Sequence, residues 1–364
     1  MSGKSLPDIR SLSLSEIRDI LVGEGAPEYR ARQVYEWLWK NNAHSFSTMS
    51  NLPVSLRNQL GDLFTLHVSR EISRQKSADG SEKVAFKLYD GKLVEAVYIP
   101  ADQRTTVCIS SQVGCALGCR FCATGTMGFS RNLLPGEMVD QLTGVMNRSD
   151  HARELPDNIV FMGMGEPLIN YGNVTMAIER ITASDGLGMS PQRITLSTAG
   201  IPSVIRKMAD DGVRYQFALS LHAASNEKRN KIMPLNQRFP LQEVSDALAY
   251  YHQKTRQRIT IEYILFNNFN DSLKDAGDLA RFCKRFPVKI NLIEYNPVPG
   301  LPFTGSSVEQ TRRFAGALEG RNMIVNIRLT KGKDIDAACG QLAGNLKSNR
   351  SVQYKTLQDE SKEL

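Results

Sequence analysis

Residues 115–122 have the sequence CALGCRFC, which places Cys115, Cys119 and Cys122 at a C-x3-C-x2-C spacing. Thiolates are the usual ligands of iron–sulfur clusters, and this close spacing lets a single loop surround one corner of a cluster. Three ligands on a four-iron cluster leave one iron open to another molecule. Zinc is the alternative, but structural zinc sites normally have four protein ligands, and no second C-x2-C pair or nearby histidine completes such a set. We therefore predict a [4Fe-4S] cluster on these three cysteines.

From residue 105 onward, candidate strands alternate with amphipathic helical stretches. The strands are expected at 105–110, 158–162, 193–197, 215–219, 259–265 and 289–293, and a further apolar run covers 323–329. The helical stretches between them include 136–146, 241–252 and 273–286. This alternation is typical of parallel strands joined by crossover helices, so it predicts an α/β barrel or a doubly wound sheet.

The first 65 residues are expected to be helical. Ser13 and Glu16 form a capping-box pair at the start of one helix, and Pro27 and Pro53 can each open another. Small helical units with basic faces often bind nucleic acid, although a solvated surface is the commoner explanation of such a face. The pattern alone does not choose between the two.

A β-hairpin is expected next, with strands over 83–89 and 92–99 joined by an Asp90-Gly91 turn. Glu95 stands in an otherwise apolar row of the second strand. The pattern leaves open whether this carboxylate faces water at a sheet edge or has a function. The predicted units are a helical domain (1–65), a β-hairpin extension (66–100), the barrel (101–345) and a polar C-terminal tail (346–364).

Polar and glycine-containing clusters directly follow several candidate strands. They are GMGEP at 163–167, STAG at 197–200, SLH at 220–222 and NP at 296–297. In α/β barrels the carboxyl ends of the strands form the rim on which active sites are built. Each cluster alone could be an ordinary loop turn. Their common placement is what favours a shared site.

Composition sets limits on the function but does not choose one. The chain has 364 residues and a formal net charge of +7, which is compatible with a polyanionic partner and equally with an ordinary basic protein. The chain has no run of eighteen apolar residues, which a helix would need to span a bilayer. Its N-terminus has no apolar signal-peptide core. We expect a cytoplasmic protein, where clustered cysteines indicate metal or redox chemistry rather than a disulfide framework.

The cysteine-containing segment resembles a known signature. A C-x3-C-x2-C motif just after the first barrel strand, with the aromatic Phe121 before its last cysteine, is similar to that of the radical S-adenosylmethionine (SAM) superfamily. In that superfamily the open iron binds SAM, and an electron from the cluster cleaves it to methionine and a 5′-deoxyadenosyl radical. The resemblance implies a partial (βα)6 barrel with one [4Fe-4S] cluster and SAM as cofactors.

Further strings, spread over residues 10–345, resemble the RlmN/Cfr family of RNA adenosine methyltransferases. They are SSQVGCALGCRFCATG, FMGMGEPL, LSTAG, SLHA, IEYILFN, YNPVPG and IDAACGQLAG. The segment GAPEYRARQVYEWLW resembles the accessory RNA-binding domain of the same family. Family members methylate C2 or C8 of adenine, carbons too electron-poor to attack the SAM sulfonium directly. The resemblance therefore implies two SAM molecules and a methyl group carried first on a protein cysteine.

The resemblance assigns three catalytic positions. Cys339 matches the methyl-carrying cysteine, and Cys108 matches the cysteine that forms a transient disulfide with it. Glu95 matches an acidic residue that the family places near the target base as proton acceptor. Whether Cys108 or Glu95 takes the proton from C2 stays open. Cys283, in an apolar helical pattern, is expected to be structural.

The same resemblance implies a SAM site. The matching positions are Gly165, Glu166, Ser197, Ser220, Leu221, His222 and Asn296. We expect Glu166 to receive the SAM ammonium, and Asn296 with the serines to contact the ribose and carboxylate. Phe121 is expected beside the adenine. One departure from the family pattern is Glu294, where many relatives have proline.

Within the family, Pro167 in GEPL indicates the C2 branch, because the C8 (Cfr-type) branch typically has alanine there. The implied substrates are 23S rRNA at the peptidyl-transferase centre and tRNA at the adenosine 3′ of the anticodon. A monomer that receives electrons from flavodoxin or ferredoxin is expected. The alternatives are a Cfr-type C8 methyltransferase, a radical SAM enzyme of another reaction type, and a non-enzymatic iron–sulfur or zinc RNA-binding protein.

Overall fold

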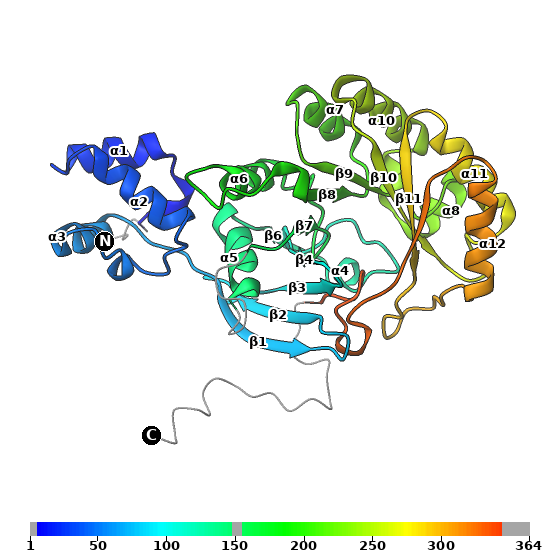
Figure 1. Ribbon diagram of the computed structural model, residues 1–364, viewed down its shortest axis with the longest axis horizontal. Coiled ribbons are helices and arrows are strands. Elements are labelled where there is room, and N and C mark those ends of the chain that lie inside the picture. Colours follow the sequence, from blue (N-terminus) through cyan, green and yellow to red (C-terminus); the bar gives the residue numbers. More distant parts are fainter. Residues whose placement is uncertain (1–5, 148–154, 344–364) are drawn as a thin grey trace, which may run out of the picture.

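A ten-stranded sheet runs through the centre of the computed structural model, which describes residues 6–147 and 155–343 (Figure 1). In sheet order the strands are β1 (Arg70–Lys76), β2 (Glu82–Lys87), β3 (Leu93–Ala101), β4 (Arg104–Cys108), β7 (Asn158–Phe161), β8 (Ile194–Thr198), β9 (Gln216–Ser220), β10 (Ile259–Leu265), β11 (Val288–Glu294) and β12 (Val325–Arg328). The sheet is antiparallel from β1 to β4 and parallel from β4 to β12. Since β1 and β12 are its two edges, the described strands form an open, partial barrel.

Helices cover the outside of the parallel strands (Figure 1). They are α5 (Pro135–Met146), α6 (Tyr171–Thr182), α7 (Pro202–Asp210), α8 (Asn226–Ile232), α9 (Leu235–Arg238), α10 (Leu241–Thr255), α11 (Leu273–Cys283) and α12 (Val308–Glu319). The short helix α4 (Ala123–Thr126) lies instead in the loop that follows β4. Neighbouring helices pack in pairs, α5 with α6, α7 with α10, and α11 with α12. One large apolar core fills the space between these helices and the sheet.

The predicted fold class is confirmed. All six predicted barrel strands are present as β4 and β7 to β11, and the late apolar run contains β12, which pairs parallel with β11. The β10–β11 register runs without a break from the pair Ile259 and Val288 to the pair Leu265 and Glu294. Because the pairing is parallel, the carboxyl ends of all these strands meet at one edge of the sheet.

Two strand pairings were not predicted. The extension has three strands rather than a two-stranded hairpin, because β1, with the sequence REISRQK, pairs antiparallel with β2. An edge strand rich in charged residues lacks the apolar alternation that would reveal it, although charge is how edges avoid aggregation. The second pairing joins β5 (Gln112–Gly114) to β6 (Phe129–Asn132), both too short to be recognised by periodicity. The predicted polar tail at 346–364 lies outside the described residues.

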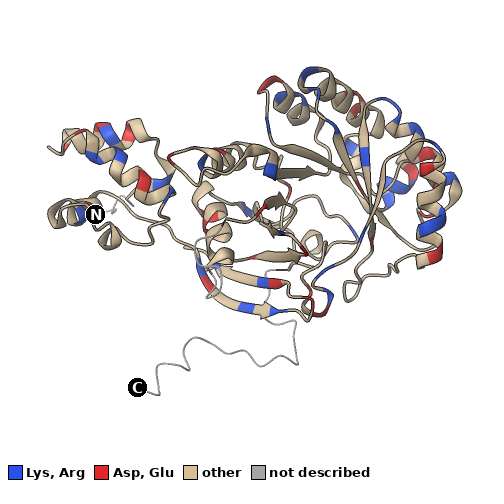
Figure 2. Cartoon of the chain, viewed as in Figure 1, with Lys and Arg blue, Asp and Glu red and all other residues tan. Residues whose placement is uncertain are grey.

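The N-terminal unit consists of α1 (Leu14–Gly23), α2 (Tyr29–Trp39) and α3 (Val54–Leu63) (Figure 1). The predicted capping box is present, because Ser13 Oγ accepts the Glu16 backbone N–H at 3.2 Å and Glu16 Oε2 accepts the Ser13 N–H at 2.7 Å. Residues 1–65 contain seven basic and seven acidic side chains, so the positive excess of the chain lies elsewhere. Figure 2 shows both signs of charge mixed on these helices.

A buried ion pair attaches this unit to the barrel. Arg10 Nη1 lies 2.7 Å from Asp140 Oδ1 on α5, and both side chains are almost fully buried. The same nitrogen donates to the Gly136 carbonyl oxygen at 3.2 Å, and Asp140 Oδ2 accepts the Ser69 N–H at 2.8 Å. A Cβ at Gly136 would lie 2.7 Å from Arg10 Cδ, so only glycine leaves room for this arginine.

No helix in the described residues is both long and apolar enough to cross a membrane.

Replacing Asp140 with alanine tests the attachment of the N-terminal unit. The substitution leaves the Arg10 cation buried without its partner, so we expect the free energy of unfolding to fall by about 3–5 kcal/mol. Urea unfolding followed by circular dichroism measures this change. Asp19→Ala is the control, because the Arg18–Asp19 pair is largely exposed and its loss should cost at most about 1 kcal/mol. Similar small losses in both variants would contradict the role given to the buried pair.

Candidate active site

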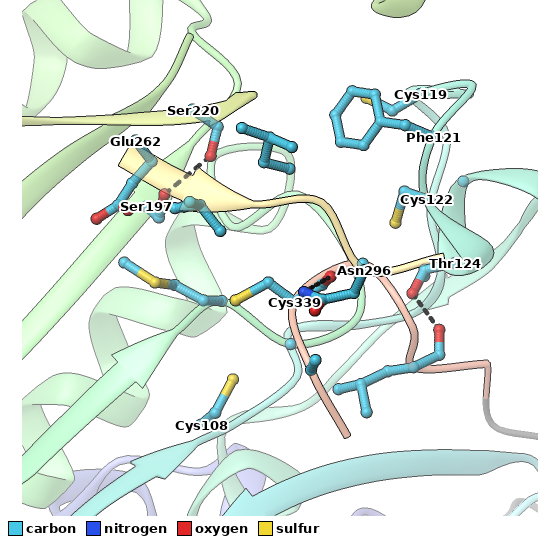
Figure 3. A pocket seen from close by; sticks show the side chains of 18 of the residues that line it. Cys108, Cys119, Phe121, Cys122, Thr124, Ser197, Ser220, Glu262, Asn296 and Cys339 are labelled. Carbon is cyan, nitrogen blue, oxygen red and sulfur yellow. Dashed lines mark hydrogen bonds between the residues drawn. The ribbon is translucent and has the colours of Figure 1, made fainter. Parts of the chain in front are cut away.

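A cavity opens at the carboxyl ends of the parallel strands (Figure 3). Its wall is formed by the cysteine loop after β4, by residues at or just after the ends of β7, β8, β9 and β11, by Glu262 and Ile264 of β10, and by residues between 328 and 342. Segments that are far apart in sequence thus share one enclosed surface.

The three motif cysteines all line this cavity. Their loop closes tightly, because the Cys115 N–H donates to the Gly128 carbonyl oxygen at 2.9 Å. Gly114 has φ +73°, and a Cβ there would lie 1.9 Å from the same Gly128 oxygen. Glycine is therefore required at this turn. Figure 3 shows Cys119 and Cys122 on the wall that this loop forms.

The donor set fits an iron–sulfur cluster. Burial raises the pKa of Cys115 to about 12 and also raises the pKa of Cys119 and Cys122, so the three thiolates need a strong positive partner. Within the described ranges, no group of three or more His, Cys, Asp or Glu side chains could hold a single metal ion. In a four-iron cluster each cysteine binds a different iron, so the thiols need not converge on one point. The cysteines therefore fit a cluster better than zinc.

Glu166 lies on the wall beside the cysteine loop, on the turn after β7. Its carboxylate is buried and accepts hydrogen bonds from the Ala199 N–H at 2.8 Å, Thr198 Oγ1 at 2.5 Å and the Leu168 N–H at 3.1 Å. Burial raises the pKa of Glu166 despite these donors. An ammonium group in the cavity would stabilise the charged carboxylate.

Gly165 allows the turn that carries Glu166. Its φ is +99°, and a Cβ would lie 2.4 Å from Gln112 Cβ. The Gln112 side chain in turn accepts the Glu166 backbone N–H at 2.8 Å. This close approach fixes the carboxylate against the strand that begins the cysteine loop.

Further polar groups come from the ends of β8 and β9. Ser197 Oγ and Ser220 Oγ lie 3.1 Å apart on the cavity wall (Figure 3). His222 Nδ1 accepts the Ile264 N–H at 3.1 Å, so a neutral ring carries its proton on Nε2. Burial lowers the pKa of His222 to about 3, which keeps the ring neutral. The ring meets Phe121 edge-on with centroids 5.1 Å apart.

Asn296 offers the cavity an unpaired acceptor. Its Nδ2 donates to the Cys339 carbonyl oxygen at 3.4 Å, but its buried Oδ1 has no hydrogen-bond partner among the described residues. Buried polar atoms are normally paired. A bound molecule with hydroxyl or ammonium donors would satisfy this oxygen, and SAM has both.

Cys108 and Cys339 approach the cavity from different sides. Cys108 ends β4, Cys339 lies in the segment after β12, and their sulfur atoms point toward one another in Figure 3. Burial raises the pKa of Cys108 to about 12, and the nearby Cys339 raises it as well. Desolvation of its sulfur also raises the pKa of Cys339, although the residue as a whole is exposed. Both are free thiols that share one space.

The sequence analysis missed Arg328 and Glu262, which also line the cavity. Arg328 Nη1 lies 3.6 Å from Glu262 Oε2, and Asn291 Nδ2 donates to Glu262 Oε1 at 2.8 Å. Arg328 acts against burial by lowering the pKa of both Cys108 and Cys339. The available signals were a carboxylate inside the apolar strand β10 and an arginine at the end of the apolar run that contains β12. The ion pair between Arg328 and Glu262 could be recognised only from the order of the strands in the sheet.

The segment that carries Cys339 is attached to the β1–β2 turn. Asp334 Oδ1 accepts the Ser77 hydroxyl at 2.5 Å, and its Oδ2 accepts the Ala78 N–H at 3.0 Å. Asp79 Oδ2 accepts the Gly332 N–H at 2.8 Å. These contacts join residues more than 250 positions apart, so no local pattern indicates them.

The other end of this segment is attached to the cysteine loop. The Ala123 N–H donates to the Gly340 carbonyl oxygen at 2.7 Å, and Thr124 Oγ1 donates to the Leu342 carbonyl oxygen at 2.6 Å (Figure 3). Glu294, the departure from the family pattern, pairs with Lys333 at 2.6 Å. It therefore adds a contact to the same segment.

Glu95 lies beside the segment that carries Cys339. It is not among the described residues that line the cavity. Its Oε2 accepts the Ala343 N–H at 2.9 Å, and its Oε1 lies 3.7 Å from Lys83 Nζ. Lys83 Nζ also donates to the Asp336 carbonyl oxygen at 3.4 Å. In this structure the carboxylate therefore holds the segment that contains Cys339.

Comparisons with known proteins identify the family of this chain. The model of the radical SAM superfamily matches residues 109–282, and that of the ribosomal RNA large subunit methyltransferase N-terminal domain matches residues 8–66. The probable dual-specificity RNA methyltransferase RlmN of Christiangramia forsetii is 49% identical over 337 residues, which are 92% of this chain and 96% of the relative. The chain belongs to the RlmN family. It is a radical SAM methyltransferase, as the resemblance implied.

Two further relatives match almost the full length of this chain. The dual-specificity RNA methyltransferase RlmN of an Anaeromyxobacter species is 41% identical over 343 residues, 93% of this chain and 90% of the relative. The crystal structure of a radical SAM methyltransferase from Sphaerobacter thermophilus superposes with a TM-score of 0.88 at 38% identity, covering 93% of this chain and 100% of that chain. Membership in the family confirms the predicted [4Fe-4S] cluster and SAM as cofactors.

The structure brings most of the predicted site residues together. Those that line the cavity are Cys108, Cys115, Cys119, Cys122, Gly165, Glu166, Ser197, Ser220, His222, Asn296 and Cys339. Leu221 is fully buried behind the wall, where its carbonyl oxygen accepts a bond from Arg229 Nε. The individual roles of these residues remain predictions.

Cys119→Ala tests the cluster ligands. Loss of one of three thiolates should reduce the iron and sulfide content after anaerobic reconstitution, and the visible absorbance of the cluster, to near background. Cys283→Ala is the matched control, because Cys283 is a buried cysteine in α11 that lies outside the cavity wall. It should bind as much iron as the unmodified chain. Full iron binding by Cys119→Ala would show that the ligand assignment is wrong.

Proposed function

We propose that this chain methylates C2 of adenosine in 23S rRNA at the peptidyl-transferase centre and in tRNA at the adenosine 3′ of the anticodon. In this proposal Cys339 carries the methyl group before it reaches the RNA. One observation supports it most: Cys108 and Cys339 face a single cavity together with the three motif cysteines and Glu166. A radical SAM enzyme of another reaction type has no need for such a second pair of cysteines.

The choice of C2 over C8 rests on the turn after β7. Pro167 directly follows Glu166 and lines the cavity, as in the C2 branch of the family. The relatives named above are called RlmN, which supports RNA as substrate and favours the C2 product over the Cfr-type alternative.

The cavity wall would hold the cofactors with separate groups. Cys115, Cys119 and Cys122 would bind the cluster, which supplies the electron that cleaves SAM to a 5′-deoxyadenosyl radical. The Glu166 carboxylate would accept hydrogen bonds from the SAM ammonium. Asn296 Oδ1 would accept a further bond, since it is buried and unpaired in the described chain.

Other wall residues would orient the rest of SAM. The hydroxyls of Ser197 and Ser220 are within reach of each other and can each turn toward a ligand. Phe121 and the neutral His222 ring form an apolar corner suited to the adenine.

Cys339 would act first as a nucleophile toward a methyl donor. Only the thiolate is a good nucleophile. Desolvation of the sulfur disfavours the Cys339 thiolate, whereas Arg328 lowers the pKa of Cys339 and so favours it. Once methylated, Cys339 would present its methyl group to the same cavity.

Cys108 would complete the reaction by forming a disulfide with Cys339, which releases the methylated RNA. External thiols would then reduce that disulfide by exchange. For the C2 proton, Glu95 is the proposed acceptor. Glu95 lies on β3, two residues from Val97, and Val97 pairs with Cys108 on the neighbouring strand β4. The two candidate proton acceptors, Glu95 and Cys108, are therefore close to one another.

The remaining parts of the proposal concern domains and partners. The helical domain (1–65) would be an accessory RNA-binding domain, followed by the β extension (66–100), the barrel (101–345) and the C-terminal tail (346–364). Flavodoxin or ferredoxin would supply electrons to a monomeric, cytoplasmic enzyme. The balanced charge of residues 1–65 means that RNA binding there depends on shape and specific contacts more than on net charge.

Cys339→Ala tests the proposed methyl carrier. Without the thiol no methyl group can be transferred to the RNA, so we expect no methylated adenosine in a 23S rRNA fragment treated anaerobically with SAM and reductant. Mass spectrometry of the digested nucleosides measures the product, and the unmodified chain should yield 2-methyladenosine. Cys283→Ala serves as the control and should remain active. Product formation by Cys339→Ala, or 8-methyladenosine from the unmodified chain, would refute the proposal.

Cys108→Ala tests the release step. Cys339 can still be methylated, and the carbon that it carries can still become bonded to the adenine. No second thiol is then available to free the RNA from Cys339. We expect the protein to remain covalently attached to the RNA. After incubation with SAM and the RNA fragment, the adduct should appear as a shifted band on a denaturing gel. Free methylated RNA at the normal rate would show that Cys108 has no role in release.

A further inference from the structure

Arg229, on α8, is a fully buried cation close to the candidate active site. It lies behind the cavity wall rather than on it, because the neighbouring Ala199, Ser220 and His222 line the cavity and Arg229 does not. Neither the motifs nor the cavity explains why a charged side chain should be placed there.

The hydrogen-bond acceptors of Arg229 in residues 6–147 and 155–343 are all neutral. Nε donates to the Leu221 carbonyl oxygen at 3.1 Å, and Nη1 donates to Asn236 Oδ1 at 2.9 Å. Nη2 donates to the carbonyl oxygens of Ala199 at 2.5 Å and Ser220 at 3.4 Å. Among the described residues, no carboxylate lies within ion-pair distance of this guanidinium, whereas the buried Arg10 is paired with Asp140.

A buried charge without a counter-charge is costly. Buried charges are normally paired or coordinated to metals, since burial removes the water that stabilises them. Burial lowers the pKa of Arg229 only to about 10, so the side chain is still a cation at neutral pH. Among the described residues this positive charge therefore has no carboxylate in direct contact, and the buried Glu166 acts on it only through space.

The cysteine loop lies next to this charge. The Arg120 N–H, directly after Cys119, donates to the carbonyl oxygen of Ile232 at the end of α8 at 2.9 Å. The positive charge of Arg229 opposes the burial that raises the pKa of Cys119, and it acts in the same sense on Glu166. The Glu166 carboxylate, however, is already bonded to Thr198, Ala199 and Leu168.

An iron–sulfur cluster is an anion of the required kind. Three thiolates outweigh the positive charge of the oxidised iron–sulfur core, and reduction by one electron adds a further negative charge. A fixed cation nearby stabilises the reduced form more than the oxidised form, and so raises the reduction potential. Charge and burial near the sulfurs are known means by which proteins set this potential.

We propose that Arg229 is the charge partner of the [4Fe-4S] cluster and raises its reduction potential. The inference rests on the cluster that the proposed function assigns to Cys115, Cys119 and Cys122. It adds a residue outside the cysteine motif that determines how easily the cluster accepts an electron. Arg229 does not touch the reacting atoms, so it is a positioning and tuning residue rather than a catalytic one.

The test is a redox titration of the reconstituted cluster, followed by electron paramagnetic resonance of the reduced form. Arg229→Gln removes the charge, and we expect the equilibrium constant for reduction to fall about tenfold, which is about 59 mV for one electron. Arg229→Lys keeps a charge but loses most of the hydrogen bonds. At mildly acidic pH, where the lysine is kept protonated, its potential should stay near that of the unmodified chain.

Asn236→Ala is the matched control, because it removes one acceptor of Arg229 and leaves the cation in place. It should change stability but not potential. A cluster that assembles in Arg229→Lys but not in Arg229→Gln would also support the proposal. An unchanged potential in Arg229→Gln, or equal shifts or equal cluster loss in the glutamine and lysine variants, would show that Arg229 only supports the backbone. If the unmodified chain bound no cluster, the proposed function itself would fail.

Discussion

Parallel hydrogen bonding from β4 to β12 is the constraint on which the candidate site depends. It places the carboxyl ends of seven strands at one edge of the sheet, so that the turns after them form a single wall. The cysteine loop follows the first of these strands, and the segment with Cys339 follows the last. Because the sheet stays open, these two segments meet each other across the cavity and close it with direct hydrogen bonds.

The parts of the site that could be predicted from sequence are those with a local pattern. Cys115, Cys119 and Cys122 are defined by spacing alone, and the turns at Glu166 and Ser197 follow recognisable strands. The family resemblance then identified Cys108 and Cys339, which no spacing could relate. Boundaries of the parallel strands were also predictable, because strands buried on both faces are continuous apolar runs.

The parts that could not be predicted depend on long-range contacts or on charge. The sequence does not show that Arg229 is buried, and its hydrogen bonds to carbonyl groups at the ends of β8 and β9 appear only in the fold. The Arg328–Glu262 pair joins β12 to β10 across β11. Glu95 shared a face with apolar residues as expected, yet its partner Ala343 lies 248 positions away. A period of two residues along a strand contains no information about such partners.

The attachments of the segment that carries Cys339 also determine the order in which the enzyme can be completed during synthesis. Its partners at residues 77–79 and 123–124 leave the ribosome some two hundred residues or more before it does. Chains fold from the N-terminus as they are made, and contacts of high sequence separation form late. The cluster-binding loop can therefore be present while one wall of the cavity is still absent. A chain that ends before residue 332 would therefore contain the three motif cysteines but neither Cys339 nor the contacts that hold its segment.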